Sequence, residues 1–159
     1  MQGTPMGHWL TLAIWIAIVG AVAMVGSWVT LPKIPTWYAG LAKPSFSPPN
    51  ELFGPVWTVL YLMMAVAVWR AGAVDSTSRS QALRLFIGQL ALNAIWSPVF
   101  FGLEAPKAGL AIIVALLITL VATIVVFLRI DRWAGLLLVP YLVWICYAAA
   151  LNAAIVALN

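Results

Sequence analysis

Long stretches without a charged side chain divide the sequence into five apolar runs. These runs cover residues 9–31, 52–69, 85–103, 108–128 and 133–159. Each has roughly the ~20 residues that an α-helix needs to cross ~30 Å of hydrocarbon. Backbone amides in lipid find no water to bond, so a spanning segment satisfies them internally as a helix. The pattern therefore predicts an all-α membrane protein, a bundle of five transmembrane helices.

The polar segments between the runs differ greatly in length. Three are polar turns, GAVDSTSRSQ, EAPK and RIDR, and the last two are typical of hairpins between antiparallel neighbouring helices. The first connection, residues 32–51, is about twenty residues long and contains five prolines, which restrict its backbone. Trp37, Tyr38, Leu41 and Phe46 are apolar anchors in this loop. We expect a stiff, structured cap packed on the helix ends.

The composition supports a membrane location and narrows the choice of partners. The chain is 65% hydrophobic and 8% charged, with a mean hydropathy of +1.07, whereas soluble domains are about 25% charged. That apolar excess needs lipid as its solvent, so membrane lipid is an expected partner. The net charge of +4 is spread without a basic cluster, which argues against nucleic acid as a partner. The single cysteine, Cys146, rules out an internal disulfide.

Charges in the connections indicate an orientation in the membrane. The second and fourth connections carry five Lys and Arg residues, and the first and third carry three. The positive-inside rule then predicts a cytoplasmic N-terminus, with the first loop and the C-terminus outside. The first run is expected to be retained rather than cleaved. No Lys or Arg precedes Trp9, and the run is longer than the apolar core of a signal peptide.

Chemistry that needs acids, bases or metals lacks its residues in this sequence. The four carboxylates, Glu51, Asp75, Glu104 and Asp131, all lie in loops or at helix ends, which argues against a proton-coupled pump. The only histidine, His8, lies near the N-terminus. No HExxH, CxxC, GxSxG or phosphate-loop motif is present. We therefore expect no metal site, no required cofactor and no acid–base catalytic residue.

Aromatic and amide side chains fall on three helical faces. Trp57 and Tyr61 are four residues apart in the second run, so they stack on one face. The other two faces consist of Gln89, Asn93, Trp96 and Phe100 in the third run, and of Tyr141, Trp144, Ala148, Leu151 and Asn152 in the fifth. Each residue alone has a structural explanation, as helix–helix contact or as core packing. Together, with Ala148 leaving space beside Trp144, they predict an apolar pocket under the loop for a flat hydrophobic ligand.

Four motifs in order resemble those of one known family. They are WYAGLAKPSFSPP (37–49), FGPVWTVLY (53–61), QLALNAIWSPVFFG (89–102) and VPYLVWICYAAALN (139–152). The sequence resembles the TspO/MBR family, the tryptophan-rich sensory proteins of bacteria, which are related to the mitochondrial translocator protein or peripheral-type benzodiazepine receptor. The similarity covers nearly the whole chain, so we expect residues 1–159 to form a single domain.

The resemblance implies a function and a site. Family members are five-helix bundles, usually homodimers, that bind porphyrins such as protoporphyrin IX and haem; animal members also bind cholesterol and benzodiazepine-type drugs. By position, the implied ligand-binding residues are Trp37, Tyr38, Phe53, Trp57, Tyr61, Asn93, Trp144, Ala148 and Leu151. Gln89 joins them from the amide face described above. Two departures limit the analogy. Ala108 replaces a tryptophan of the animal members, and no basic residue follows Tyr141 or Tyr147, which lowers the expected sterol affinity.

Three activities are compatible with such a pocket. We expect a tetrapyrrole-binding protein or sensor in a bacterial cell membrane, the inner rather than the outer one. The macrocycle would stack against Trp57 and Trp144, an amide such as Asn93 would orient it, and Lys43 is the nearest cation for its propionates. One alternative is light-dependent porphyrin breakdown, in which Trp57 and Trp144 would be the catalytic residues without any acid or base. Transport of porphyrin or sterol is the other.

Overall fold

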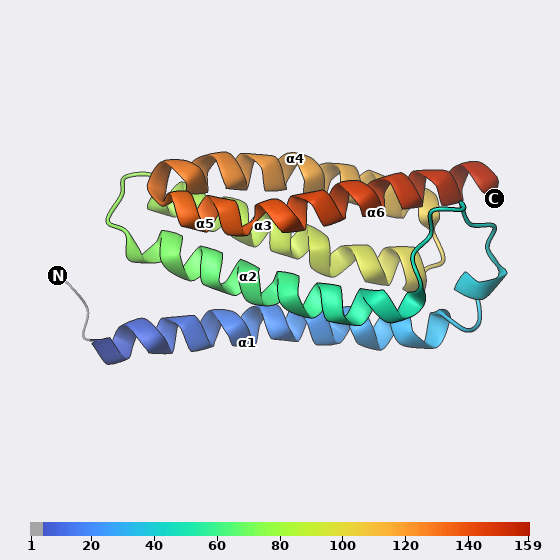
Figure 1. Cartoon of the computed structure of the whole chain (residues 1–159), viewed down its shortest axis with the longest axis horizontal. Helices are drawn as coiled ribbons and strands as arrows, with labels where there is room; N and C mark the ends of the chain where they lie inside the picture. The colour runs from blue at the N-terminus through green and yellow to red at the C-terminus, as the bar shows by residue number, and fades with distance from the viewer. Residues whose placement is uncertain (1–4) are drawn as a thin grey trace.

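Membrane-spanning helices run up and down in a single bundle (Figure 1). The computed structural model describes residues 5–159. Its α-helices are α1 (Pro5–Thr30), α2 (Phe53–Ala73), α3 (Arg79–Ser97), α4 (Pro106–Ile130), α5 (Arg132–Leu137) and α6 (Val139–Leu158). Within this part of the chain, five helical segments are long and apolar enough to cross a membrane, and α5 and α6 together form the fifth. The predicted all-α, five-span membrane architecture is confirmed.

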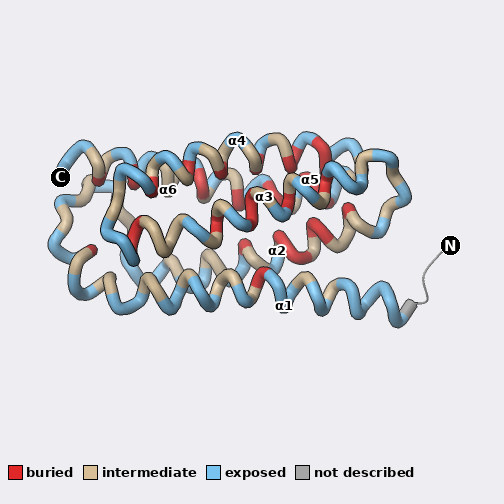
Figure 2. Tube along the Cα trace, turned by 180° about the vertical axis from the view of Figure 1, so that it is seen from behind, coloured by how far each residue is buried: buried red, intermediate tan, exposed pale blue. Residues whose placement is uncertain are grey.

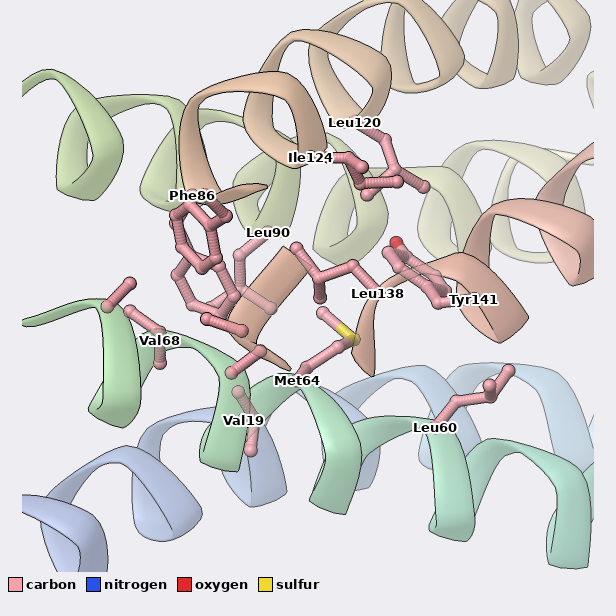
Figure 3. Packing of buried hydrophobic residues seen from close by; sticks show 14 of the residues in the cluster. Val19, Leu60, Met64, Val68, Phe86, Leu90, Leu120, Ile124, Leu138 and Tyr141 are labelled. Atoms are coloured by element: carbon pink, nitrogen blue, oxygen red, sulfur yellow. The ribbon is translucent and has the colours of Figure 1, made fainter. Parts of the chain in front are cut away.

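A dense core lies mainly in the half of the bundle away from the first loop and extends to Val19 and Leu60 (Figure 3). Phe86 of α3 stacks on Phe127 of α4 with 6.1 Å between ring centroids, and Trp15 of α1 meets Phe86 edge-on at 5.5 Å. Ala65 and Ala67 of α2 are completely buried, and such small residues let neighbouring helices approach closely. We call this region the packed half and the remainder, towards the first loop, the hollow half. The packed half comprises residues 6–15, 63–92 and 117–143, and the hollow half residues 16–62, 93–116 and 144–159.

Helix α1 lies at the edge of the bundle. Val19 is its only buried residue among those whose burial is described, and Figure 2 shows this as a single buried segment along the helix. Near the N-terminus, the Trp69 indole of α2 donates a hydrogen bond of 2.9 Å to the carbonyl of His8. Near the first loop, α1 instead lies against the end of α3, where a Cβ built on Gly26 would be 3.6 Å from the Ser97 hydroxyl. Helix α1 therefore bonds to α2 near the N-terminus and lies against the end of α3 near the first loop, with Trp15 already contacting Phe86 of α3 in the packed half.

The fifth span is interrupted, whereas the apolar run 133–159 predicts one continuous helix. Helix α5 ends at Leu137, and α6 begins at Val139. Pro140, in the first turn of α6, has no backbone N–H to donate to the carbonyl four residues earlier. The helical hydrogen bonding therefore stops at this point and starts again, which corrects the sequence prediction while leaving the span in place.

The connection into the fifth span holds three helices together. Asp131 accepts a hydrogen bond of 2.8 Å from the backbone N–H of Trp133 and so caps α5. The same carboxylate pairs with Arg70 near the end of α2 at 2.7 Å. Gly135 packs directly against Leu128 of α4, where any Cβ would overlap the leucine side chain. Only glycine fits this close approach without a shift of one helix.

The third span ends in a π-turn, Pro98–Gly102, rather than in a regular α-helical turn. A backbone hydrogen bond of 2.9 Å from Leu103 to Pro98 closes this wider turn. Both Phe100 and Phe101 are buried by it, whereas the helical stripe predicted from the sequence includes only Phe100. A π-turn adds a residue to the turn, so it brings adjacent side chains to a face that a strict helical period would separate.

The first loop forms a structured cap over the helix ends, as predicted. Its 3₁₀ turns are Leu31–Lys33, Tyr38–Gly40 and Asn50–Leu52. The Asn159 side chain donates to the carbonyl of Ala42 and accepts from the Ala42 N–H, both at 3.0 Å. The Tyr147 hydroxyl donates to the carbonyl of Phe46 at 2.7 Å. These bonds attach the middle of the loop to α6, through Tyr147 near the middle of the helix and Asn159 at its end.

Candidate ligand-binding cavity

The hollow half of the bundle encloses a cavity of about 420 Å³. Its walls come from α1, α2, α3 and α6, with residues of α4 contributing and Tyr38 of the cap included in the lining. The α1 wall is made largely of small residues, among them Gly20, Ala23 and Gly26. Space remains here because the side chains of these residues are too small to fill the gap between α1 and the other helices.

Most of the predicted site residues line this cavity. They are Tyr38, Phe53, Trp57, Tyr61, Asn93, Trp144, Ala148 and Leu151. Trp37 and Gln89 do not line it. Trp37 packs edge-on against Phe100 at 5.6 Å without being part of the lining. Gln89 lies one helical turn from Asn93 and is fully buried in the packed half, where its amide has no hydrogen-bond partner among the described residues.

Aromatic rings form one continuous side of the cavity. The rings of Trp57 and Tyr61 are stacked at 5.2 Å and 29°, as their spacing of four residues predicts. Trp57 meets Trp144 of α6 edge-on at 6.5 Å and 88°, and Phe53 meets Trp144 at 5.8 Å and 74°. Edge-to-face and offset pairs are the favoured geometries for aromatic side chains. The rings therefore hold one another in place and present a preformed surface to a flat ligand.

Asn93 links three helices at the base of this aromatic side. Its carbonyl oxygen accepts a hydrogen bond of 2.7 Å from the Tyr61 hydroxyl, and its nitrogen donates to the Tyr141 hydroxyl at 2.9 Å. Bonds of this kind inside a membrane bundle contribute on average ~0.6 kcal/mol each. Asn93 therefore has a structural role first. One N–H and one lone pair of its amide remain for a ligand.

Asn152 makes a second link between helices at the cavity wall. Its carbonyl oxygen accepts from the Trp96 indole at 3.4 Å, and its nitrogen donates to the carbonyl of Pro106 at 2.9 Å. The Trp96 ring also stacks on Phe100 at 5.0 Å and 20°. A Cβ built on Gly109 would approach the Asn152 oxygen to 3.2 Å, so α4 and α6 meet closely here. The amides of Asn93 and Asn152 thus bond to protein, whereas the buried Trp144 indole nitrogen has no hydrogen-bond partner among the described residues.

The described lining contains no charged side chain. Lys43, the cation expected near an anionic ligand, donates to a loop carbonyl at 3.1 Å and lies 4.8 Å from the centre of the Tyr38 ring. Lys33 pairs with Glu104 at 2.6 Å.

Burial, with a smaller contribution from nearby Tyr147, raises the pKa of Tyr38, so this phenol is neutral at pH 7. Across the described residues, no cluster of His, Cys, Asp and Glu is suited to hold a metal ion.

Sequence reasoning missed two parts of the lining. Gly20, Ala23 and Ser27 of α1 line the cavity at offsets of zero, three and seven, a helical face of small residues that the pattern does contain. It was not recognised because small residues also serve ordinary helix packing. Phe101 lines the cavity through the π-turn, and no regular helical period predicts its position.

The fold and this cavity define a class of protein: an integral membrane protein whose five-span helical bundle encloses an uncharged pocket walled by aromatic rings. The TspO/MBR family model matches residues 13–158, and the chain belongs to that family. It is 45% identical over 150 residues to the "Tryptophan-rich protein TspO" of Archaeoglobus fulgidus, covering 94% of this chain and 97% of the relative.

Two further relatives widen the comparison. The chain is 37% identical over 151 residues to the "Tryptophan-rich sensory protein" of Cereibacter sphaeroides, covering 95% of this chain and 92% of the relative. It is 40% identical over 121 residues to the human "Translocator protein", covering 73% of this chain and 70% of the relative. The resemblance stated from the four motifs is confirmed.

Proposed function

We propose that the protein binds tetrapyrroles such as protoporphyrin IX and haem, and other flat hydrophobic molecules, in the cavity, and that it acts as a membrane binding protein or sensor. The observation that carries this proposal is the uncharged lining in which Trp57, Tyr61 and Trp144 converge on one space. Aromatic contacts add ~0.5–1.5 kcal/mol each beyond simple burial. Several such contacts and the burial of both ring faces support micromolar affinity, about −8 kcal/mol.

In this binding mode the macrocycle lies against Trp57 and Trp144, and the small Ala148 leaves room beside the tryptophan. Its propionates stay towards the cap, near Asn50, because burying a carboxylate in the uncharged part of the cavity would be costly. Lys43 would reach a propionate only after leaving its present contact with Tyr38. Sterols are further candidates by shape and polarity.

The direct test is a titration of the protein in lipid nanodiscs with protoporphyrin IX and with haem, followed by visible absorbance. Ala148→Phe fills the space beside Trp144 and should weaken binding about tenfold or more, a loss of ~1.4 kcal/mol. Trp57→Phe keeps a ring and should weaken binding about threefold. Trp133→Phe is the matched control, because Trp133 is 65% exposed and outside the lining. Equal affinity in all three variants would mean that the ligand does not occupy this cavity.

Light-dependent breakdown of the bound porphyrin is the second candidate, favoured by the two tryptophan rings in one wall of the cavity. Trp57→Phe and Trp144→Phe should retain most of the binding but stop the protein-dependent loss of the porphyrin's Soret absorption under illumination. Porphyrin in empty nanodiscs is the control. Equal loss of the Soret absorption in empty nanodiscs would reject an enzymatic reaction.

Transport is tested by porphyrin flux across vesicles, which Trp144→Ala should abolish.

We also propose a homodimer in the bacterial inner membrane with its N-terminus in the cytoplasm. The exposed residues Ala13, Ala17 and Ala21 form a row of small side chains on the outside of α1, a surface of the kind that membrane helices use to associate.

The orientation of the chain in the membrane is tested in whole cells with an impermeant thiol reagent on a Cys146→Ser background. Ser45→Cys in the first loop should react from outside, and Thr77→Cys in the second connection should not.

A further inference from the structure

The exposed residues of the cavity lining are all on one side. They are Ile16, Ser27 and Leu31 at the α1 edge, and Gly54, Thr58 and Leu62 on α2, together with Asn50 just before α2. Lining residues from α3, α4 and α6 are buried or half-buried. Deep residues such as Asn93 stay buried even though they face the cavity, so exposure marks its opening. The opening is therefore a slot between α1 and α2.

The contacts of α1 explain why the slot is there. At the far end α1 is bonded to α2 through the indole of Trp69, and Trp9 stacks on the same ring at 5.6 Å. Towards the first loop, α1 lies instead against the end of the third span, where a Cβ built on Gly102 would be 3.3 Å from Val29. The neighbour of α1 therefore changes along its length, and lining residues of α1 and α2 are left exposed in the hollow half. The α2 edge from Gly54 to Leu62 is ~12 Å long at 1.5 Å per residue.

The slot faces the interior of the membrane. Its α1 edge belongs to the span Met6–Lys33, and its α2 edge to the span Asn50–Ala73. Exposed lining residues well inside these spans, such as Ile16 and Thr58, contact acyl chains rather than water, whereas Leu31 and Asn50 lie at the span ends. The side towards water is covered, because Tyr38 is 5% exposed and packs against Phe101 at 5.5 Å.

We propose that this slot is a lateral portal through which the cavity exchanges its ligand with the lipid leaflet on the side of the first loop, while the cap stays closed. The substrate class is then a neutral or largely apolar molecule that dissolves in the bilayer before it binds. The inference depends on the proposed function only for the identity of that ligand, because the portal itself follows from the exposure and contacts of α1 and α2.

The test follows access to the cavity without using a tetrapyrrole. Ala148→Cys, on a Cys146→Ser background, places a single thiol in the cavity wall of the protein in nanodiscs. The membrane-soluble reagent N-phenylmaleimide should label it, and a charged sulfonated maleimide should not. The labelling of the cavity thiol is compared with that of the native Cys146 in the unmodified protein, which is exposed on α6. Failure of both reagents to label Ala148→Cys would overturn the proposal.

Three further variants locate the route. Thr58→Trp narrows the slot and should slow labelling at least about tenfold, because passage through a constriction limits association. Val59→Trp is the matched control, since Val59 is 56% exposed and does not line the cavity. Asn159→Ala removes the two bonds to Ala42 of the cap, leaves the bond between Tyr147 and Phe46 in place, and should leave the rate unchanged. Unchanged labelling in Thr58→Trp, or fast labelling of Asn159→Ala by the charged reagent, would overturn the portal. Failure of porphyrin binding in the separate titration would overturn only the proposed function.

Discussion

The packed half and the hollow half of the bundle are built from the same spans, yet they use apolar side chains in opposite ways. In the packed half, Phe86, Phe127 and Met64 are completely buried in one cluster that also contains small alanines. In the hollow half, Trp57 and Trp144 are only half-buried and border an empty space. Hydrophobicity alone therefore does not determine whether a membrane bundle is solid or hollow. Side-chain size and the change in the neighbours of α1 along its length make the difference.

The largest expected difference between the halves comes from removing one aromatic ring in each. Phe86→Ala leaves a cavity in the packed half and should lower the free energy of unfolding by ~3–5 kcal/mol. Phe53→Ala enlarges a space that already exists and should cost about 1–2 kcal/mol. Chemical denaturation in detergent micelles, followed by circular dichroism, measures both. Equal losses would show that the hollow half is as tightly packed as the other.

A smaller contrast is expected from adding a methyl group at two glycines. Gly135→Ala forces a Cβ into Leu128 of α4 and should lower the stability by ~1–3 kcal/mol through overpacking. Gly54→Ala meets nothing within 4 Å and should be neutral or stabilising by up to about 1 kcal/mol, because alanine favours the helix. Thermal unfolding of the two variants in the same detergent makes the comparison. A destabilised Gly54→Ala alongside an unaffected Gly135→Ala would reverse it.

The two buried amides of α3 sharpen the comparison further. Asn93→Leu removes hydrogen bonds to Tyr61 and Tyr141 and should cost about 1 kcal/mol. Gln89→Leu removes an amide without a partner among the described residues and should leave the stability unchanged or raise it by up to ~1 kcal/mol. Denaturant midpoints of both variants test this. If Gln89→Leu is as damaging as Asn93→Leu, then the Gln89 amide binds a partner such as an internal water molecule.

The smallest expected effect is a pH dependence of the cap. Burial raises the pKa of Tyr38 above its ordinary value of 10.0, so the folded protein disfavours the phenolate. The contribution of the Tyr38 hydroxyl to the stability of the fold is complete below the ordinary pKa. It is lost as the pH rises beyond that value, because the unfolded chain then releases the phenol proton more readily than the folded protein does. Between about pH 9 and pH 11, the free energy of unfolding should fall by a few tenths of a kcal/mol less in Tyr38→Phe than in the wild type. An identical pH profile for both proteins would contradict the burial of this hydroxyl.

Much of the site follows from local rules that the sequence contains. The stacked pair of Trp57 and Tyr61 needs only the helical period, and the structured cap needs only prolines and aromatic anchors in one loop. The outcome at Trp37 and Gln89 does not follow from such rules. Trp37 lies just before the 3₁₀ turn that begins at Tyr38, and only the tertiary structure shows that Tyr38 lines the cavity and Trp37 does not. The π-turn that buries Phe101 likewise depends on backbone geometry that helix periodicity does not contain.

The sequence by itself determined the five spans and their alternating direction, because backbone groups in lipid must bond internally and the polar turns are too short for other connections. It also determined that the interior would carry aromatic rings and amides but no charge. Only the tertiary structure decided which amide is bonded, where the fifth span breaks, and on which side the cavity opens. Those features depend on the rotation and tilt of whole helices, above all of α1. Many weak contacts between distant residues set that rotation and tilt, and no local pattern does so.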